Sequence, residues 1–127
     1  MPTAETPTGP IHYEVTDLTP PWVDAPETVI FHHGVGIDMN IWSDWLPMVA
    51  TDFRCVRLDM RGFGRSHIPP KGFAWSMDQL KDDLLAVADA VGAERFHLVG
   101  ESIGGTISLY TAIHVGDRIQ SVTALST

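Results

Sequence analysis

The chain has 127 residues, and 44% of them are hydrophobic, which is typical of a folded domain and argues against a disordered segment. Its formal net charge is −8 and its few basic residues do not cluster, so we expect neither nucleic-acid nor membrane partners. The sequence has no leader-like start and no apolar stretch of membrane-spanning length, and its lone Cys55 cannot form an internal disulfide, so we expect a cytoplasmic protein.

The first part of the chain predicts two strands and a helix. The proline-rich residues 1–10 are expected to fray, and the alternating pattern of residues 11–15 predicts a half-buried strand. A continuous β-branched run at 28–31 predicts a parallel strand that is covered on both faces. The apolar spacing of residues 41–50 predicts a helix, in which Pro47 fits only near the start or at a kink.

The second part continues the alternation of strands and helices. We expect strands at 55–58, 96–99 and 121–125, a helix from the capping box Ser76–Gln79 to Gly92, and a helix at 103–115. This order indicates βαβ units with right-handed crossovers. The predicted class is therefore α/β, with a mostly parallel sheet and helices on both faces.

The segment Gly100-Glu101-Ser102-Ile103-Gly104 lies between a predicted strand and a predicted helix. A G-x-S-x-G pattern in this context is typical of a sharp turn that exposes the serine hydroxyl. Such a turn crowds the positions two before and two after the serine, which favours Gly100 and Gly104. Ser102 is therefore the candidate nucleophile.

Two further motifs also follow predicted strands, His33-Gly34-Val35-Gly36 and the octet Asp59–Ser66. Together with the turn at Ser102, in this order and spacing, they make residues 11–125 similar to the N-terminal half of an α/β-hydrolase. Within that family the sequence resembles single-domain esterases, enol-lactonases and carbon–carbon bond hydrolases. The resemblance implies a hydrolase that acts on carboxylic esters, lactones or related activated carbonyl compounds.

The resemblance also implies roles for individual residues. Ser102 would be the nucleophile, and the backbone N–H groups of Val35 and Ile103 would form the oxyanion hole. The supporting residues of the two motifs would be His33, Gly34, Gly36, Gly100 and Gly104. No spacing typical of a metal site and no phosphate-binding loop occurs, so we expect neither a metal nor another cofactor.

Other candidates have structural interpretations that compete with functional ones. His32 and His33 are expected to make structural hydrogen bonds rather than to act as the base, and His97 to be a core histidine. Asp59 and Arg61 are expected to form a buried pair that pins their loop.

Glu101, beside the nucleophile, either tunes the electrostatic field at Ser102 or is merely solvated. Phe63, Trp75 and Met39 are candidates for lining an apolar acyl pocket.

In the family's chain order the acid and the histidine follow the serine. We therefore expect residues 1–127 to be the N-terminal portion of a single domain, completed by a C-terminal fragment of the same protein as a second chain. Without it, the strand at 121–125 would be an open sheet edge. The alternative to an esterase or lactonase is a ligand-binding, receptor-like protein or an inactive member of the fold.

Overall fold

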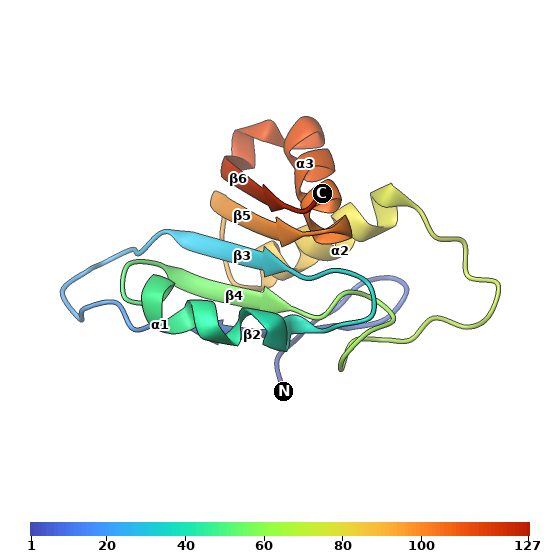
Figure 1. Ribbon diagram of the computed structural model, residues 1–127, viewed down its shortest axis with the longest axis horizontal. Coiled ribbons are helices and arrows are strands. Elements are labelled where there is room, and N and C mark those ends of the chain that lie inside the picture. The colour runs from blue at the N-terminus through green and yellow to red at the C-terminus, as the bar shows by residue number, and fades with distance from the viewer.

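A six-stranded sheet forms the centre of the computed structural model, which describes residues 1–127 (Figure 1). The spatial order of the strands is β1-β2-β4-β3-β5-β6. Strands β3 to β6 run parallel to one another, whereas β2 pairs antiparallel with β4 and β1 antiparallel with β2. Their bounds are β1 Thr3–Ala4, β2 Ile11–Thr16, β3 Thr28–His32, β4 Arg54–Leu58, β5 Phe96–Glu101 and β6 Ile119–Leu125. The predicted α/β class with a mostly parallel sheet is confirmed.

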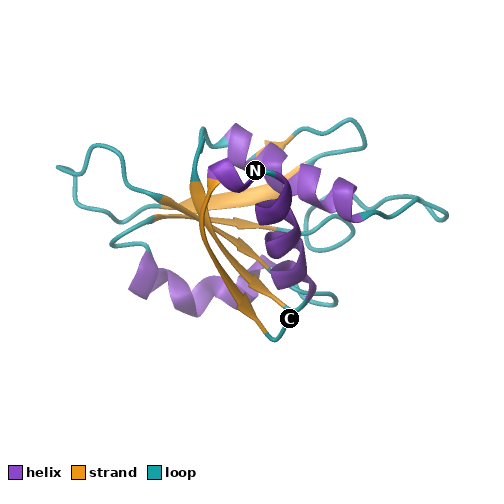
Figure 2. Cartoon of the chain, turned by 90° about the horizontal axis from the view of Figure 1, so that it is seen from above, coloured by secondary structure: helices purple, strands orange, loops and turns teal.

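Helices cover both faces of this sheet (Figure 2). Successive side chains of a strand point to opposite faces of its sheet. In β3, Ile30 packs in the core cluster that includes side chains of α2 and α3. The next residue, Phe31, packs on the other face in the cluster that includes Trp42 of η1. The helical segments are η1 Met39–Trp45, α1 Leu46–Val49, α2 Met77–Ala90, α3 Ile103–His114 and η2 Gly116–Arg118. None of the helices combines the length and the apolar character needed to cross a bilayer.

Helix α2 begins as its sequence predicts. The Ser76 hydroxyl accepts a hydrogen bond from the backbone N–H of Gln79 at 3.0 Å, which caps the helix. The Gln79 side chain does not reach back to Ser76, and its amide instead donates to Asp83 at 3.0 Å. Only one half of the predicted capping box is therefore present.

The helix expected at residues 41–50 is mostly a 3₁₀ helix. Asp38 caps η1 by accepting a hydrogen bond from the Asn40 backbone N–H at 2.8 Å, and α-helical bonding begins only at Leu46. Pro47 lies in the first turn of α1, where its missing N–H costs no hydrogen bond. The sequence thus located Pro47 correctly but not the type of helix that precedes it.

The N-terminal segment is ordered, so the expectation that residues 1–10 fray is wrong. Strand β1 pairs with β2, and Ala4 is buried in the core. The buried guanidinium of Arg61 donates to the Thr8 carbonyl at 2.7 Å and to the Thr6 hydroxyl at 2.9 Å. A buried guanidinium requires such acceptors, and this segment supplies two of them.

The three sequence motifs meet at the carboxyl ends of the parallel strands. His32, the last residue of β3, pairs with Leu58 at the end of β4 and with Gly100 near the end of β5. All three parallel strands therefore end side by side, which is where α/β sheets place their ligands.

Candidate active site

The turn between β5 and α3 holds Ser102 in a strained backbone conformation. Its φ is 55° and its ψ is −124°, a region that residues other than glycine rarely adopt. The carbonyl of Leu125 in β6 accepts a hydrogen bond from the Ser102 N–H at 2.8 Å, so the neighbouring strand helps to hold the turn. Ser102 thus lies at the strand-to-helix junction that the sequence predicted.

Two glycines allow three backbone segments to approach one another around this turn. A Cβ on Gly104 would overlap the carbonyl oxygens of His32 and His33 at the end of β3. A Cβ on Gly100 would overlap the backbone of Gly104. Both positions therefore require glycine for close packing and not for a positive φ.

The Ser102 hydroxyl is available for chemistry but has no base. The side chain is half-buried, and it does not cap α3. Ring nitrogens of His12, His32, His33, His97 and His114 are hydrogen-bonded to groups other than Ser102. Helix α3 begins directly after the serine, so its positive dipole end lies beside the hydroxyl.

The loop after β3 passes close to the serine. A Cβ built on Gly34 would lie 3.1 Å from the Cβ of Ser102, so glycine gives the loop its closest approach there. Val35 follows with 65% of its surface exposed, and it lines the same cavity as Ile103. The structure therefore brings together the two residues proposed as oxyanion-hole donors, while the donor role of their amides stays a prediction.

His33 fastens this loop to the loop after β4. Its Nε2 accepts a hydrogen bond from the Met60 N–H at 2.8 Å, and its Nδ1 donates to the Gly34 carbonyl at 2.7 Å. One acceptor and one donor nitrogen define a neutral imidazole, and burial accordingly lowers the pKa of His33. His33 is thus a structural residue with no nitrogen free to act as a base.

His32 is also kept neutral by its surroundings. It is fully buried at the end of β3, and its Nδ1 donates to the His33 carbonyl at 2.9 Å. Burial lowers the pKa of His32 from 6.5 to about 4. The expected structural role of both histidines agrees with these contacts.

The low pKa of His32 predicts a loss of stability in acid. Between pH 6.5 and pH 4 the unfolded chain binds a proton at His32 that the folded chain does not, so the free energy of unfolding should fall by about 3 kcal/mol. Urea unfolding at a series of pH values measures this slope. The variant H32N keeps a donor for the His33 carbonyl but does not titrate, and an equally steep slope in H32N would contradict the prediction.

The octet after β4 is held by Asp59, but not through the predicted pair. The Asp59 carboxylate accepts hydrogen bonds from the N–H groups of Met39 at 2.9 Å and Arg65 at 3.0 Å. Arg61 pairs instead with Asp83 of α2 through two bonds, Nε to Oδ2 at 2.8 Å and Nη2 to Oδ1 at 2.7 Å. The expected Asp59–Arg61 pair is therefore wrong, although both residues are buried and both fix the loop.

An apolar cavity of about 310 Å³ adjoins the candidate oxyanion residues. Its walls contain no polar side chain and are formed by Val35, Met60, Phe63, Trp75, Leu80 and Ile103. Phe63 and Trp75 lie where an acyl pocket was expected. Met39 does not line this cavity; it is buried elsewhere, and its backbone N–H is bonded to Asp59.

Glu101 is not simply a solvated neighbour of the nucleophile. Its Oε2 atom is buried and has no hydrogen-bond partner, and a Cβ on Gly34 would lie 2.6 Å from it. The carboxylate thus lies under the loop that carries Val35. No sequence pattern distinguishes such a buried carboxylate from an exposed one.

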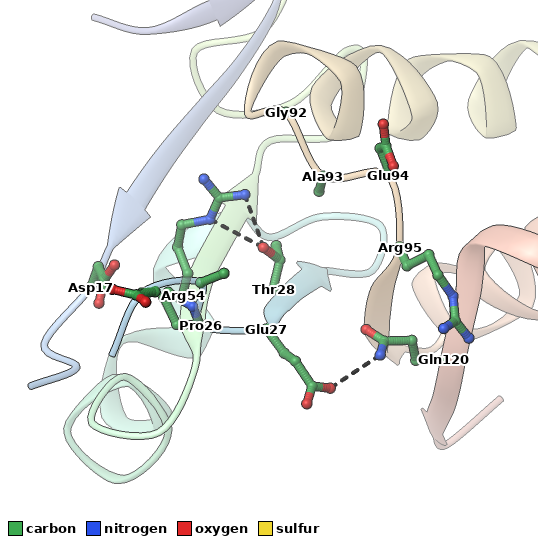
Figure 3. Close-up of a pocket in the computed structure, with 12 residues that line it drawn as sticks. Asp17, Pro26, Glu27, Thr28, Arg54, Gly92, Ala93, Glu94, Arg95 and Gln120 are labelled. Atoms are coloured by element: carbon green, nitrogen blue, oxygen red, sulfur yellow. Dashed lines mark hydrogen bonds between the residues drawn. The ribbon is translucent and has the colours of Figure 1, made fainter. Parts of the chain in front are cut away.

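The largest cavity of the chain, about 480 Å³, lies elsewhere (Figure 3). It is lined by residues at the starts of the parallel strands, among them Thr28, Arg54, Arg95 and Gln120. These N-terminal ends of the strands lie at the end of the sheet opposite to Ser102, which follows the carboxyl end of β5. Two of these lining residues are bonded to each other: Nε and Nη2 of Arg54 donate to the Thr28 hydroxyl at 3.1 and 2.9 Å.

The sequence profile of the alpha/beta hydrolase fold family matches residues 27–127. The chain belongs to this family. The match begins just before β3 and includes all three motifs and Ser102. The α/β-hydrolase resemblance of the sequence is thereby confirmed.

Among curated relatives, this hydrolase-fold chain is 35% identical over 105 residues to RutD of Rhizobium rhizogenes, covering 81% of the chain and 38% of RutD. It is 28% identical over 104 residues to 3-oxoadipate enol-lactonase 1 of Acinetobacter baylyi, covering 80% of the chain and 38% of that enzyme. The 2-hydroxy-6-oxo-2,4-heptadienoate hydrolase of Pseudomonas putida is 32% identical over 101 residues, with 77% and 36% covered.

Solved structures agree with these relatives. The enol-lactonase of Burkholderia xenovorans superposes with a TM-score of 0.85 at 26% identity, over 95% of this chain and 45% of that one. Est816, described as degrading N-acyl homoserine lactones, superposes with a TM-score of 0.87 at 27% identity, over 98% and 45%. The chain spans less than half of the length of these proteins and is related to lactonases and hydrolases.

Proposed function

We propose that Ser102 is the nucleophile of a hydrolase that acts on carboxylic esters, lactones or related activated carbonyl compounds. The observation that carries this proposal is the strained backbone of Ser102 at a strand-to-helix turn, with an unbonded hydroxyl beside Gly34 and an apolar cavity. Strain of this kind persists only where the surrounding structure enforces it, and it is concentrated at functional sites.

The proposed chemistry begins with attack of the Ser102 oxygen on the substrate carbonyl carbon. Negative charge then develops on the carbonyl oxygen, where the N–H groups of Val35 and Ile103 would stabilise it. Loss of one such donor typically costs about 3 kcal/mol of transition-state stabilisation. The dipole of α3 acts in the same direction.

The base for this attack would come from a C-terminal segment of the same protein, which would supply an aspartate or glutamate and a histidine. In support of this, no histidine of residues 1–127 is hydrogen-bonded to Ser102, and Est816 and the B. xenovorans enol-lactonase are more than twice as long as the matched region. Strand β6 is at the edge of the sheet, and Ile113 on α3 is 80% exposed, so a further segment has apolar surface to cover.

The cavity beside Ser102 supports an uncharged acyl group as substrate. None of its six lining side chains carries a positive charge, so burial of a carboxylate there would be unfavourable. Each buried methylene would instead contribute about 0.8 kcal/mol. We therefore infer that aliphatic or aromatic acyl chains are preferred.

The test uses a fusion of this chain to the segment that follows the matched region in the B. xenovorans enol-lactonase. We expect the soluble fusion to hydrolyse p-nitrophenyl butyrate continuously and a p-nitrophenyl ester of succinate much more slowly, whereas the unfused chain should show no sustained turnover. A folded fusion that binds butyrate esters without hydrolysing them would instead favour a ligand-binding protein, and sustained turnover by the unfused chain would contradict the need for a C-terminal segment.

A further inference from the structure

A serine, a histidine and a carboxylate that lie far from Ser102 form a chain of two hydrogen bonds. The Ser121 hydroxyl lies 2.6 Å from Nδ1 of His97, and Nε2 of the same ring lies 2.7 Å from the Glu27 carboxylate. Ser121 belongs to β6 and His97 to β5, and Glu27 immediately precedes β3. His97, which pairs with Ser121, and Ser102 are five positions apart in the sequence, a distance of about 16 Å along an extended strand, so Ser121 and Ser102 belong to different sites.

The partners of the ring determine where its proton lies. The hydrogen bond from His97 lowers the pKa of Glu27, so Glu27 is a carboxylate at neutral pH and can only accept. Nε2 therefore carries the proton, and Nδ1 of the neutral ring is left as an acceptor for the Ser121 O–H. This is the polarity in which an imidazole can remove a proton from a serine.

The surroundings hold the ring in this orientation. Phe53 packs edge-on against His97, with ring centroids 5.5 Å apart and an interplanar angle of 80°. Glu27 is in turn fixed by the side-chain amide of Gln120, which donates to it at 3.1 Å. Ser121 itself is exposed in the 127-residue chain, so a reagent can reach its hydroxyl there.

The large cavity at this end of the sheet adjoins this chain of hydrogen bonds. Glu27 and Gln120 contribute to its wall, and Figure 3 shows the guanidinium of Arg95 beside Gln120. Arg95 is near enough to Glu27 to contribute to lowering its pKa, and its side chain forms neither a hydrogen bond nor a salt bridge. The wall of this cavity thus carries a positive charge on the side of Glu27 and Gln120.

We propose that Ser121 is a second reactive serine, with His97 as its general base and Glu27 as the residue that orients the base. Its substrates would be electrophiles with a good leaving group, such as fluorophosphonates and activated esters. The Ser121 oxygen bonds to the phosphorus or carbonyl carbon while its proton moves to Nδ1 of His97. The bond to the leaving group then breaks, and His97 returns the proton to that group or to water.

The test is the rate of labelling by diisopropyl fluorophosphate in the 127-residue chain carrying S102A, followed by peptide mapping. We expect one adduct, on Ser121, with fluoride released in equal amount. H97Q should lower the labelling rate of Ser121 by about 100-fold, since general-base catalysis typically contributes that much. E27Q should lower it as well. Ser126, which is exposed and has no histidine partner, gives the background rate within the same molecule.

Two results would overturn the proposal. The first is labelling of Ser121 no faster than that of Ser126, or equally fast in H97Q. The second comes from ¹⁵N NMR of the imidazole, which reports the proton position without any reagent. A neutral His97 protonated on Nδ1 would leave no acceptor for the Ser121 hydroxyl. Neither result bears on Ser102, which is absent from the labelled variant.

Discussion

Replacing Ser102 with alanine in the fusion protein is expected to lower kcat/KM for p-nitrophenyl butyrate by a factor on the order of 10⁵ or more. The variant would lose the attacking oxygen but keep the cavity and the neighbouring amides, so only the small residual rate from binding and charge stabilisation would remain. The fold should be unaffected, because the Ser102 hydroxyl makes no hydrogen bond that stabilises the turn.

The matched control is S126A, which removes an exposed hydroxyl from the residue that directly follows Leu125, whose carbonyl accepts the Ser102 N–H. It should retain full turnover and the wild-type unfolding curve. Initial rates and circular dichroism of both variants are the measurements. Turnover in S102A within tenfold of the unsubstituted fusion would show that another group is the nucleophile.

Replacing Arg61 with methionine is expected to lower the free energy of unfolding by about 3–5 kcal/mol. Removing the guanidinium leaves Asp83, whose side chain is only 4% exposed, as a buried charge without its partner. The substitution also leaves the Thr8 carbonyl without the donor that anchors the N-terminal segment. Urea unfolding of the chain or of the fusion measures the loss.

The double variant R61M/D83L separates loss of the pair from loss of packing. Because both charges are then absent, much of the stability should return, as happens when buried ion pairs are replaced by apolar side chains. A loss below 1 kcal/mol in R61M alone would mean that Asp83 finds another partner or water. A double variant less stable than R61M would mean that the polar contacts of Arg61, rather than the pairing of charges, dominate.

The strand and helix pattern and the turn at Ser102 could be predicted because they depend on local sequence. A continuous apolar run predicts a covered parallel strand such as β3. Gly100 and Gly104 indicate that backbone segments pack too closely around the turn at Ser102 for a side chain at either position. The order of motifs then placed Val35 near Ile103, because parallel strands end at a common edge.

Contacts between residues far apart in the sequence were harder to predict. The sequence predicts a pair between Arg61 and Asp59, two residues away, but Arg61 pairs with Asp83 on the next helix. A signal was available, since Asp83 occupies the apolar side of α2 between Leu80 and Leu84, where a charge needs a buried partner. Nothing comparable marked residues 1–10, whose order depends on Arg61 and on pairing with β2.

The most direct test of the proposed site is a crystal structure of the fusion with phenylboronic acid, which forms a tetrahedral adduct with an activated serine. The prediction is a covalent bond from boron to the Ser102 oxygen, with one boronate oxygen about 2.7–3.1 Å from the backbone nitrogens of both Val35 and Ile103. The phenyl ring should lie in the cavity lined by Phe63 and Trp75. An adduct whose oxygens contact neither amide, or a boronate bound away from Ser102, would contradict the assignment.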